Sequence, residues 1–171
     1  MKKILPLFIL ALSCRSVPAQ NTDSLYAIWN DPQQADTVRL SAIEDFLWAI
    51  QHSDPDSAEK CAGKMLALSK KIGAQQKAAS ERYQASALEL LANSYYIRGD
   101  VNTALTHYNE ALQLNVKRKD PDGVAGILGN IGSMYTVLGQ FDEARTFQQH
   151  SLDLFTLIGK EEGIGLGNNN L

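Results

Sequence analysis

The sequence predicts an all-α protein, a right-handed solenoid of antiparallel helix hairpins. Three observations indicate this fold class. Apolar residues recur with helical spacing after residue 36, no Val/Ile/Thr-rich alternating stretch is bounded by hairpin turns, and a set of residues returns after 40 positions. A period of this size is typical of stacked repeat proteins, in which each hairpin buries its apolar side against the next one.

The 40-residue period involves the positions that a packed helix hairpin needs. An aromatic residue, a glycine and a small residue recur in the same order: Tyr95, Gly99 and Ala104 return as Tyr135, Gly139 and Ala144. Larger apolar residues keep the same step: Leu88, Leu91 and Leu112 return as Leu128, Ile131 and Leu152. Small residues let two helices approach closely, and glycine accepts the left-handed backbone that commonly ends a helix. The period therefore predicts two equivalent hairpins.

Residues 1–19 are predicted to be a secretory signal peptide. Lys2 and Lys3 precede an apolar run over residues 4–12, and small residues follow up to Ala19, the expected cleavage position. The run of nine residues is far shorter than the roughly 20 residues that span a bilayer. We therefore expect an exported protein, periplasmic or otherwise extracytoplasmic, in a bacterium.

Cys14 offers an alternative interpretation of this leader. A bacterial lipoprotein signal also places a lipid-bearing cysteine after small residues. In this chain Ala11 stands where such a signal has leucine, so the sequence favours cleavage after Ala19 over lipidation of Cys14.

Residues 20–36 are predicted to cap the solenoid. Asp23 to Asn30 can form a short helix that carries Leu25, Ile28 and Trp29. The end of a solenoid needs a cover for its first apolar face. We therefore expect Trp29 to be buried against the next helix and not to stack on a ligand.

Residues 37–73 are predicted to form a degenerate first hairpin that lacks the Gly and Tyr marks. Its first helix has apolar residues at i, i+3, i+4 and i+7 from Leu40 to Ile50. Asp54-Pro55 then supplies a capping acid before a proline, a strong start signal for the second helix, which ends near Gly73. Cys61 on that helix is expected to be a small buried hydrophobe and not a nucleophile.

Residues 74–119 and 120–160 are predicted to form two complete repeats. Each has a first helix, a glycine turn and a second helix, over 75–98 and 101–117, then 121–138 and 141–158. Asp120-Pro121 repeats the acid–proline start. The basic run Lys117–Lys119 falls at a helix end, where cations interact favourably with the helix dipole, and we interpret it as a solvated cap.

Residues 161–171 repeat the opening of the preceding first helix. Gly163 corresponds to Gly123, and Asn170 corresponds to Asn130. We predict that this stretch is the first half of a further, truncated repeat and that the chain is a fragment of a longer protein.

The order of large, small, aromatic, glycine and alanine residues resembles the tetratricopeptide repeat. Its motif is seen in LLANSYYIRGDVNTALTHYNEAL (90–112) and NIGSMYTVLGQFDEARTFQQHSL (130–152). The resemblance is strong over residues 80–171 and weak over 37–73, and the 40-residue step is similar to the longer variants of the repeat, as in kinesin light chain. It implies a helical scaffold that binds a protein or an extended peptide.

The charge balance excludes some classes of partner. The chain has a net charge of −3, and removing the three cations of the leader-like segment leaves −6. A region this acidic lacks the basic surface that nucleic-acid binding needs. It also lacks a basic face for anionic lipid headgroups.

No arrangement of residues predicts catalysis, a cofactor or a metal site. His52, His107 and His150 do not belong to a set of four converging nitrogen or sulfur ligands, and we expect solvated helix positions for them. The glycine string over 163–167 lacks the preceding strand of a phosphate loop. No nucleophile stands at a recognisable spacing from a base, so this segment is expected not to be an enzyme.

The predicted binding site is the inner side of the first helices. In the repeats that the chain resembles, these helices line a concave groove where asparagine binds the backbone of an extended peptide. Asn130 and Asn170 fall at that position in successive repeats. Further groove candidates on the same face are Asn93, Glu89, Tyr96, Ser133 and Thr136. In the alternative interpretation, these asparagines bond neighbouring helices.

The basic residues of the carboxylate clamp in chaperone-binding members are missing, so a C-terminal carboxylate is not the expected ligand. The sequence thus predicts an extracytoplasmic scaffold for a protein or peptide. In the alternative, SLYAIWNDPQQADTVRL (24–40) resembles the start of bacterial sensory regions. In such proteins a transmembrane helix and a histidine kinase or an adenylate or guanylate cyclase would follow Leu171. Membrane contact is expected only through that downstream sequence or a lipidated Cys14.

Overall fold

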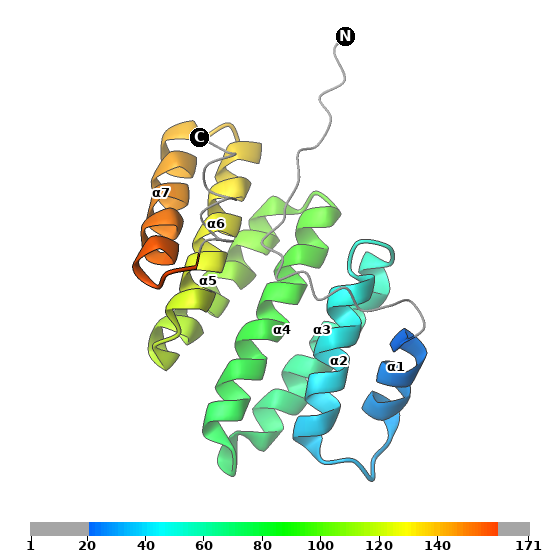
Figure 1. Cartoon of the computed structure of the whole chain (residues 1–171). Helices are drawn as coiled ribbons and strands as arrows, with labels where there is room; N and C mark the ends of the chain where they lie inside the picture. The colour runs from blue at the N-terminus through cyan, green and yellow to red at the C-terminus, as the bar shows by residue number, and fades with distance from the viewer. Residues whose placement is uncertain (1–20, 161–171) are drawn as a thin grey trace.

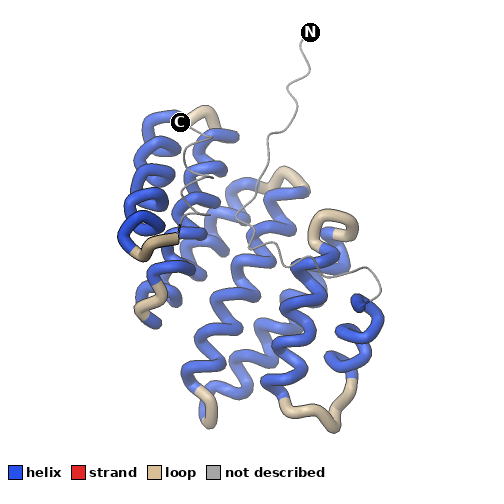
Figure 2. Tube along the Cα trace, viewed as in Figure 1, coloured by secondary structure: helices blue, strands red, loops and turns tan. Residues whose placement is uncertain are grey.

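The computed structural model describes residues 21–160, which form seven α-helices and no strand (Figures 1 and 2). The helices in chain order are α1 (Thr22–Asn30), α2 (Asp36–Ile50), α3 (Pro55–Lys71), α4 (Lys77–Ile97), α5 (Val101–Arg118), α6 (Pro121–Val137) and α7 (Phe141–Leu157), with a short 3-10 turn, η2 (Ile72–Ala74), after α3. The predictions for residues 1–19, Cys14, the string over 163–167, residues 161–171 and Asn170 lie outside the described residues.

Successive helices form antiparallel pairs that stack side by side, α2 with α3, α4 with α5 and α6 with α7 (Figure 1). The predicted fold class, an all-α solenoid of helix hairpins, is confirmed. The helices also begin and end within about two residues of the positions that the sequence indicates, the usual uncertainty of a helix end.

Acidic residues begin three of the helices by accepting hydrogen bonds from otherwise unpaired backbone N–H groups. Asp54, Asp100 and Asp120 each accept a bond of 3.1 Å from the amide three residues later. Pro55 and Pro121 follow two of these caps at the first helical position. The acid–proline start that the sequence predicts is therefore present in both places.

Left-handed residues end the first helices of the two complete hairpins. Gly99 has a φ of +85° and Gly139 a φ of +75°. At both glycines the backbone turns back into the second helix, as the period predicts. Lys119 also adopts a positive φ, of 56°, at the end of α5, where the next period has Gly159 with a φ of +70°.

Small residues set the close approach of the two helices within a hairpin. A Cβ atom added at Gly132 in α6 would lie 2.8 Å from Cγ of Gln148 and 3.1 Å from the carbonyl oxygen of Ala144, both in α7. Ala104 in α5 is fully buried at the position that corresponds to Ala144. The contact positions predicted from the period therefore serve as helix contacts.

An aromatic stack recurs at equivalent positions of the two hairpins. The ring of Tyr95 lies 5.5 Å from that of His107, and the ring of Tyr135 lies 5.2 Å from that of Phe147. Each tyrosine comes from a first helix and its partner from the second helix of the same hairpin. The prediction of a solvated His107 is wrong, because this stacking keeps the imidazole partly buried.

The buried apolar residues form two clusters along the stack. One extends from Trp29 through α2 and α3 to Leu91 of α4, and the other joins α4, α5 and α6. Trp29 is buried as expected for a capping segment, with the guanidinium of Arg39 5.2 Å above its ring. Cys61 is buried in the first cluster, and desolvation raises the pKa of its thiol, so it has the character of a core residue.

Candidate functional site

The first helices of the hairpins, α2, α4 and α6, share one side of the stack. Three contacts between side chains join them: Arg82 donates to Glu44 at 2.8 and 3.0 Å, Asn93 donates to Gln51 at 2.9 Å, and Asn130 Nδ2 lies 3.5 Å from Glu89 Oε1. Glu89 and Tyr96 are seven residues apart, about two turns, and so project on the same side of α4. We call the surface formed by Glu44, Arg82, Glu89, Tyr96, Asn130, Ser133 and Thr136 the first-helix face.

Glu89 is the most perturbed acid on this face. Desolvation raises the pKa of its carboxyl group to about 7, and the nearby charges of Glu44 and Asp122 add to the effect. Glu44 pairs with Arg82, and Asp122 pairs with Lys160 at 2.7 Å. Within residues 21–160, no cationic side chain forms an ion pair with Glu89.

Asn130 lies next to Glu89, and its side-chain amide has a donor and an acceptor that the described residues do not use fully. Its side chain belongs to a residue that is only 4% exposed, and its one described hydrogen bond is the long contact to Glu89. Among the described residues, none donates to its Oδ1 atom. The Asn130 amide can therefore both donate to and accept from a molecule on the first-helix face.

Asn93 belongs to a buried network under this face. Its Nδ2 donates to Oε1 of Gln51, and its Oδ1 accepts from the hydroxyl group of Tyr108. These bonds connect α4 with the end of α2 and with α5, and Asn93 is 7% exposed. Asn93 therefore follows the alternative interpretation of the sequence, in which an asparagine forms hydrogen bonds to neighbouring helices and does not bind a peptide.

The three other described groove candidates lie on or near the surface. The hydroxyls of Ser133 and Thr136 each donate to the carbonyl four residues earlier in α6, at 3.1 Å. Tyr96 is partly buried, and desolvation raises the pKa of its phenol. These side chains add hydroxyl groups to the first-helix face, nearer the carboxyl ends of α4 and α6 than the Glu89–Asn130 contact.

Sequence reasoning missed several contributors to this region. Gln51, Arg82 and Tyr108 have no marked place in the 40-residue period, and only the packing of α2, α4 and α5 brings them to Glu44 and Asn93. The opposite charges of Arg82 and Glu44 are only a weak indication in the sequence that these two residues are in contact, because a charged helical protein has many such possible pairs.

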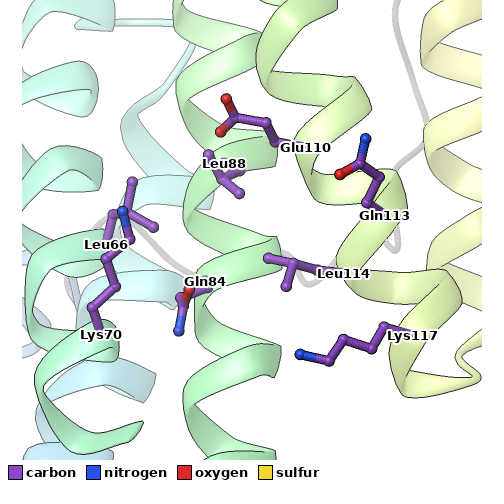
Figure 3. A pocket seen from close by; sticks show the side chains of 8 residues that line it. All are labelled: Leu66, Lys70, Gln84, Leu88, Glu110, Gln113, Leu114 and Lys117. Carbon is purple, nitrogen blue, oxygen red and sulfur yellow. The ribbon is translucent and has the colours of Figure 1, made fainter.

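A recess lies on another side of the molecule, between α3, α4 and α5 (Figure 3). It has a volume of about 320 Å³ and is lined by Leu66, Lys70, Gln84, Leu88, Glu110, Gln113, Leu114 and Lys117. On α4, its residues Gln84 and Leu88 lie roughly 100–140° around the helix from Glu89. The recess is therefore separate from the first-helix face.

The histidines of the described residues are not gathered with other side chains that bind metals. Within residues 21–160, no group of three or more His, Cys, Asp or Glu side chains is arranged to hold a metal ion. His107 Nδ1 is buried without a hydrogen bond in this part of the chain, and its nearest acid is Glu110, with Oε2 at 4.0 Å. The sequence interpretation that no acidic residue stands one turn from His107 is wrong, because Glu110 follows it by three residues.

The repeated hairpins lie where the sequence matches a known family of repeats. Residues 83–156 match the tetratricopeptide repeat family. Residues 83–156 thus form a tetratricopeptide repeat region. Such repeats generally mediate protein–protein interaction, and a tetratricopeptide repeat scaffold is typically not an enzyme. The match begins within α4 and ends at the last turn of α7, so it includes Glu89, Tyr96 and Asn130.

A solved structure shares the tetratricopeptide-like fold. The crystal structure of BtubC (BKLC) from P. vanneervenii aligns with a TM-score of 0.63 and 19% sequence identity, over 83% of this chain and 56% of that one. The chain thus spans about half the length of that protein. No curated protein matches the sequence. In the described part of the repeat protein, no helix is both long and apolar enough to cross a membrane.

Proposed function

We propose that this chain is a scaffold that binds a protein through an extended peptide segment laid along the first-helix face. The observation that carries the proposal is the amide of Asn130. It lies between two successive first helices, is nearly buried, and keeps an acceptor and a donor that the described residues do not use fully. A peptide backbone presents N–H and C=O groups to which such an amide is complementary.

The surroundings of Asn130 support this use. Glu89 approaches it from α4, and the hydroxyl-bearing side chains of Ser133 and Thr136 follow it along α6. Buried Asn93 and Tyr108 hold α4 against α5 beneath the face. A site supported by rigid helices keeps its polar groups in place before the ligand arrives, which limits the entropy lost on binding.

Asn130→Ala tests this function. Peptides selected on the full chain from a phage-displayed random library serve as fluorescent probes, and their dissociation constants are measured by anisotropy. We expect affinity to fall about tenfold, because the substitution removes a donor and an acceptor from a nearly buried site. Asn109→Ala on the exposed side of α5, where the amide donates only to its own helix at Leu105, is the matched control.

Equal affinity of Asn130→Ala and the unaltered chain would contradict the assignment of the first-helix face, provided that both proteins have the same helical circular dichroism. Loss of affinity in Asn109→Ala alone would instead indicate that the peptide binds to the second helices.

We further propose that the scaffold acts outside the bacterial cytoplasm. The support is the pattern of residues 1–19, with a basic start, a short apolar run and small residues at the cleavage position. The same pattern is part of the second candidate function, in which the repeats are the sensory region of a larger signalling protein, a histidine kinase or a nucleotide cyclase.

The sequence of residues 24–40, SLYAIWNDPQQADTVRL, favours that second candidate, because it resembles the start of bacterial sensory regions. A membrane-spanning segment and an effector domain encoded after Leu171 would support this candidate, and a stop after a few more repeats would leave the scaffold.

A further inference from the structure

Two acids of the first-helix face, Glu44 and Glu89, and the nearby Asp122 have charges that are compensated unequally. Glu44 of α2 pairs with Arg82 at 2.8 Å, and Asp122 of α6 pairs with Lys160 at 2.7 Å. Glu89 of α4 lies between them and forms no ion pair with a described residue. Its only described hydrogen bond is the 3.5 Å contact from Asn130. The middle acid is therefore the one whose charge is left without a cation.

The absence of a cation beside Glu89 matters because of where its carboxyl group lies. Its carboxylate is largely removed from water, and both neighbouring acids act on it. An ionised group in such a place is disfavoured unless it is paired and hydrogen-bonded. Tyr108, whose phenol is close enough for the charge of Glu89 to raise its pKa, carries no positive charge.

The neighbourhood also has polar atoms and room for a ligand. Asn130, nine-tenths buried beside Glu89, has an Oδ1 atom that accepts no hydrogen bond from residues 21–160. One turn earlier on α6, a Cβ atom added at Gly126 would meet no atom within 4 Å. The acceptors of Glu89 and Asn130 therefore lie beside open space on α6.

We propose that Glu89 and Asn130 form a subsite that receives the lysine or arginine side chain of a peptide bound along the first-helix face. The proposal rests on the function proposed above and adds the chemistry of one peptide position. The cation pairs with the Glu89 carboxylate, and the Asn130 oxygen accepts from its remaining N–H groups. An acidic side chain at this position is repelled by Glu44, Glu89 and Asp122, and an apolar one leaves the buried carboxylate unpaired.

The test compares peptide selection on the unaltered chain and on Glu89→Gln. This substitution keeps the shape of the side chain and a hydrogen-bonding partner for Asn130, and removes only the charge. The probe is the phage-displayed random library, followed by synthetic pairs of the selected peptides in which the basic residue is replaced by norleucine. Glu110→Gln, at a 54% exposed side chain in the recess between α3, α4 and α5, is the matched control.

We expect the unaltered chain and Glu110→Gln to select peptides with lysine or arginine at one fixed position, and Glu89→Gln to lose that preference. Replacing the basic residue by norleucine should weaken binding to the unaltered chain about tenfold or more, and should change binding to Glu89→Gln little. The norleucine peptide binding both proteins alike is the outcome that overturns the cation subsite.

Two other outcomes separate this proposal from the function on which it rests. In the first, the selected peptides have no preference for a basic residue but still bind more weakly to Asn130→Ala. This outcome would support the peptide-binding face and contradict the role of Glu89. A library from which the unaltered chain enriches no peptide would reject both proposals.

Discussion

Single residues of the first helices have different roles although their sequence positions look alike. Asn93 and Asn130 are both buried asparagines on first helices, yet Asn93 has its amide bonded to Gln51 and Tyr108, while Asn130 has one long contact to Glu89. Sequence reasoning placed both in a groove because they lie on one side of the repeat. It could not separate them, because the partner Gln51 stands 42 residues from Asn93, in a hairpin without the repeat marks.

Glu89 gives a prediction for stability as a function of pH. Its pKa is about 7 in the folded protein against an ordinary value of 4.5. Below about pH 4.5 both folded and unfolded states are protonated. Between these values the unfolded state loses its proton first, so the free energy of unfolding falls as pH rises and levels off above pH 7. Because the side chain retains some solvent contact, we expect a loss of about 1–2 kcal/mol.

Glu89→Gln should remove this part of the pH dependence and make the protein more stable than the unaltered chain at about pH 8. Urea denaturation followed by circular dichroism, at about pH 5 and about pH 8, measures both effects. The same difference between the two pH values in Glu89→Gln and the unaltered chain would contradict the perturbed carboxyl group.

At the scale of the helix, two glycines of α6 illustrate what the sequence could indicate. Gly132 and its equivalent in the period, Ala92, are both small, a pattern that favours a helix contact, and α7 packs against Gly132. The open surroundings of Gly126 have no counterpart in the sequence pattern. Whether a glycine faces a neighbour or open space is decided by the rotation of the helix in the stack.

These glycines give a paired prediction. Gly126→Ala should stabilise the protein by about 0.5–1 kcal/mol, because alanine favours the helix and its Cβ meets no neighbour within 4 Å. Gly132→Ala should destabilise it by about 1–3 kcal/mol, because its Cβ forces α7 away at Gln148 and Ala144. Urea denaturation of the two variants measures the difference, and a change of the same sign in both would show that the α6–α7 distance is not fixed by Gly132.

At the scale of the whole molecule, the repeat period made the fold predictable. Acid–proline starts, glycine turns and small contact residues recur at fixed positions, so each hairpin can be identified from the chain alone. The candidate site was less predictable. The first-helix side followed from the period, but the charge balance around Glu89 depends on Arg82 and Lys160, which come from different hairpins and follow no shared spacing.

The proposed export of the molecule predicts that its mature form begins at Gln20. Intact-mass analysis of protein expressed with its own leader in a bacterial host, and fractionated into cytoplasm and periplasm, measures this directly. Cleavage after Ala19 is expected because small residues precede it. A diacylated Cys14 at the new N-terminus would overturn this assignment in favour of a lipoprotein.

Tyr108 gives the folded stack a built-in optical marker. Its hydroxyl group is enclosed between α4 and α5 and donates to Asn93, and its pKa lies well above the ordinary value of 10 because of burial and the nearby Glu89. Its ring is fully buried, so the folded stack opposes loss of this proton. The last tyrosinate absorbance to appear in an alkaline titration is therefore expected to accompany the separation of α4 and α5.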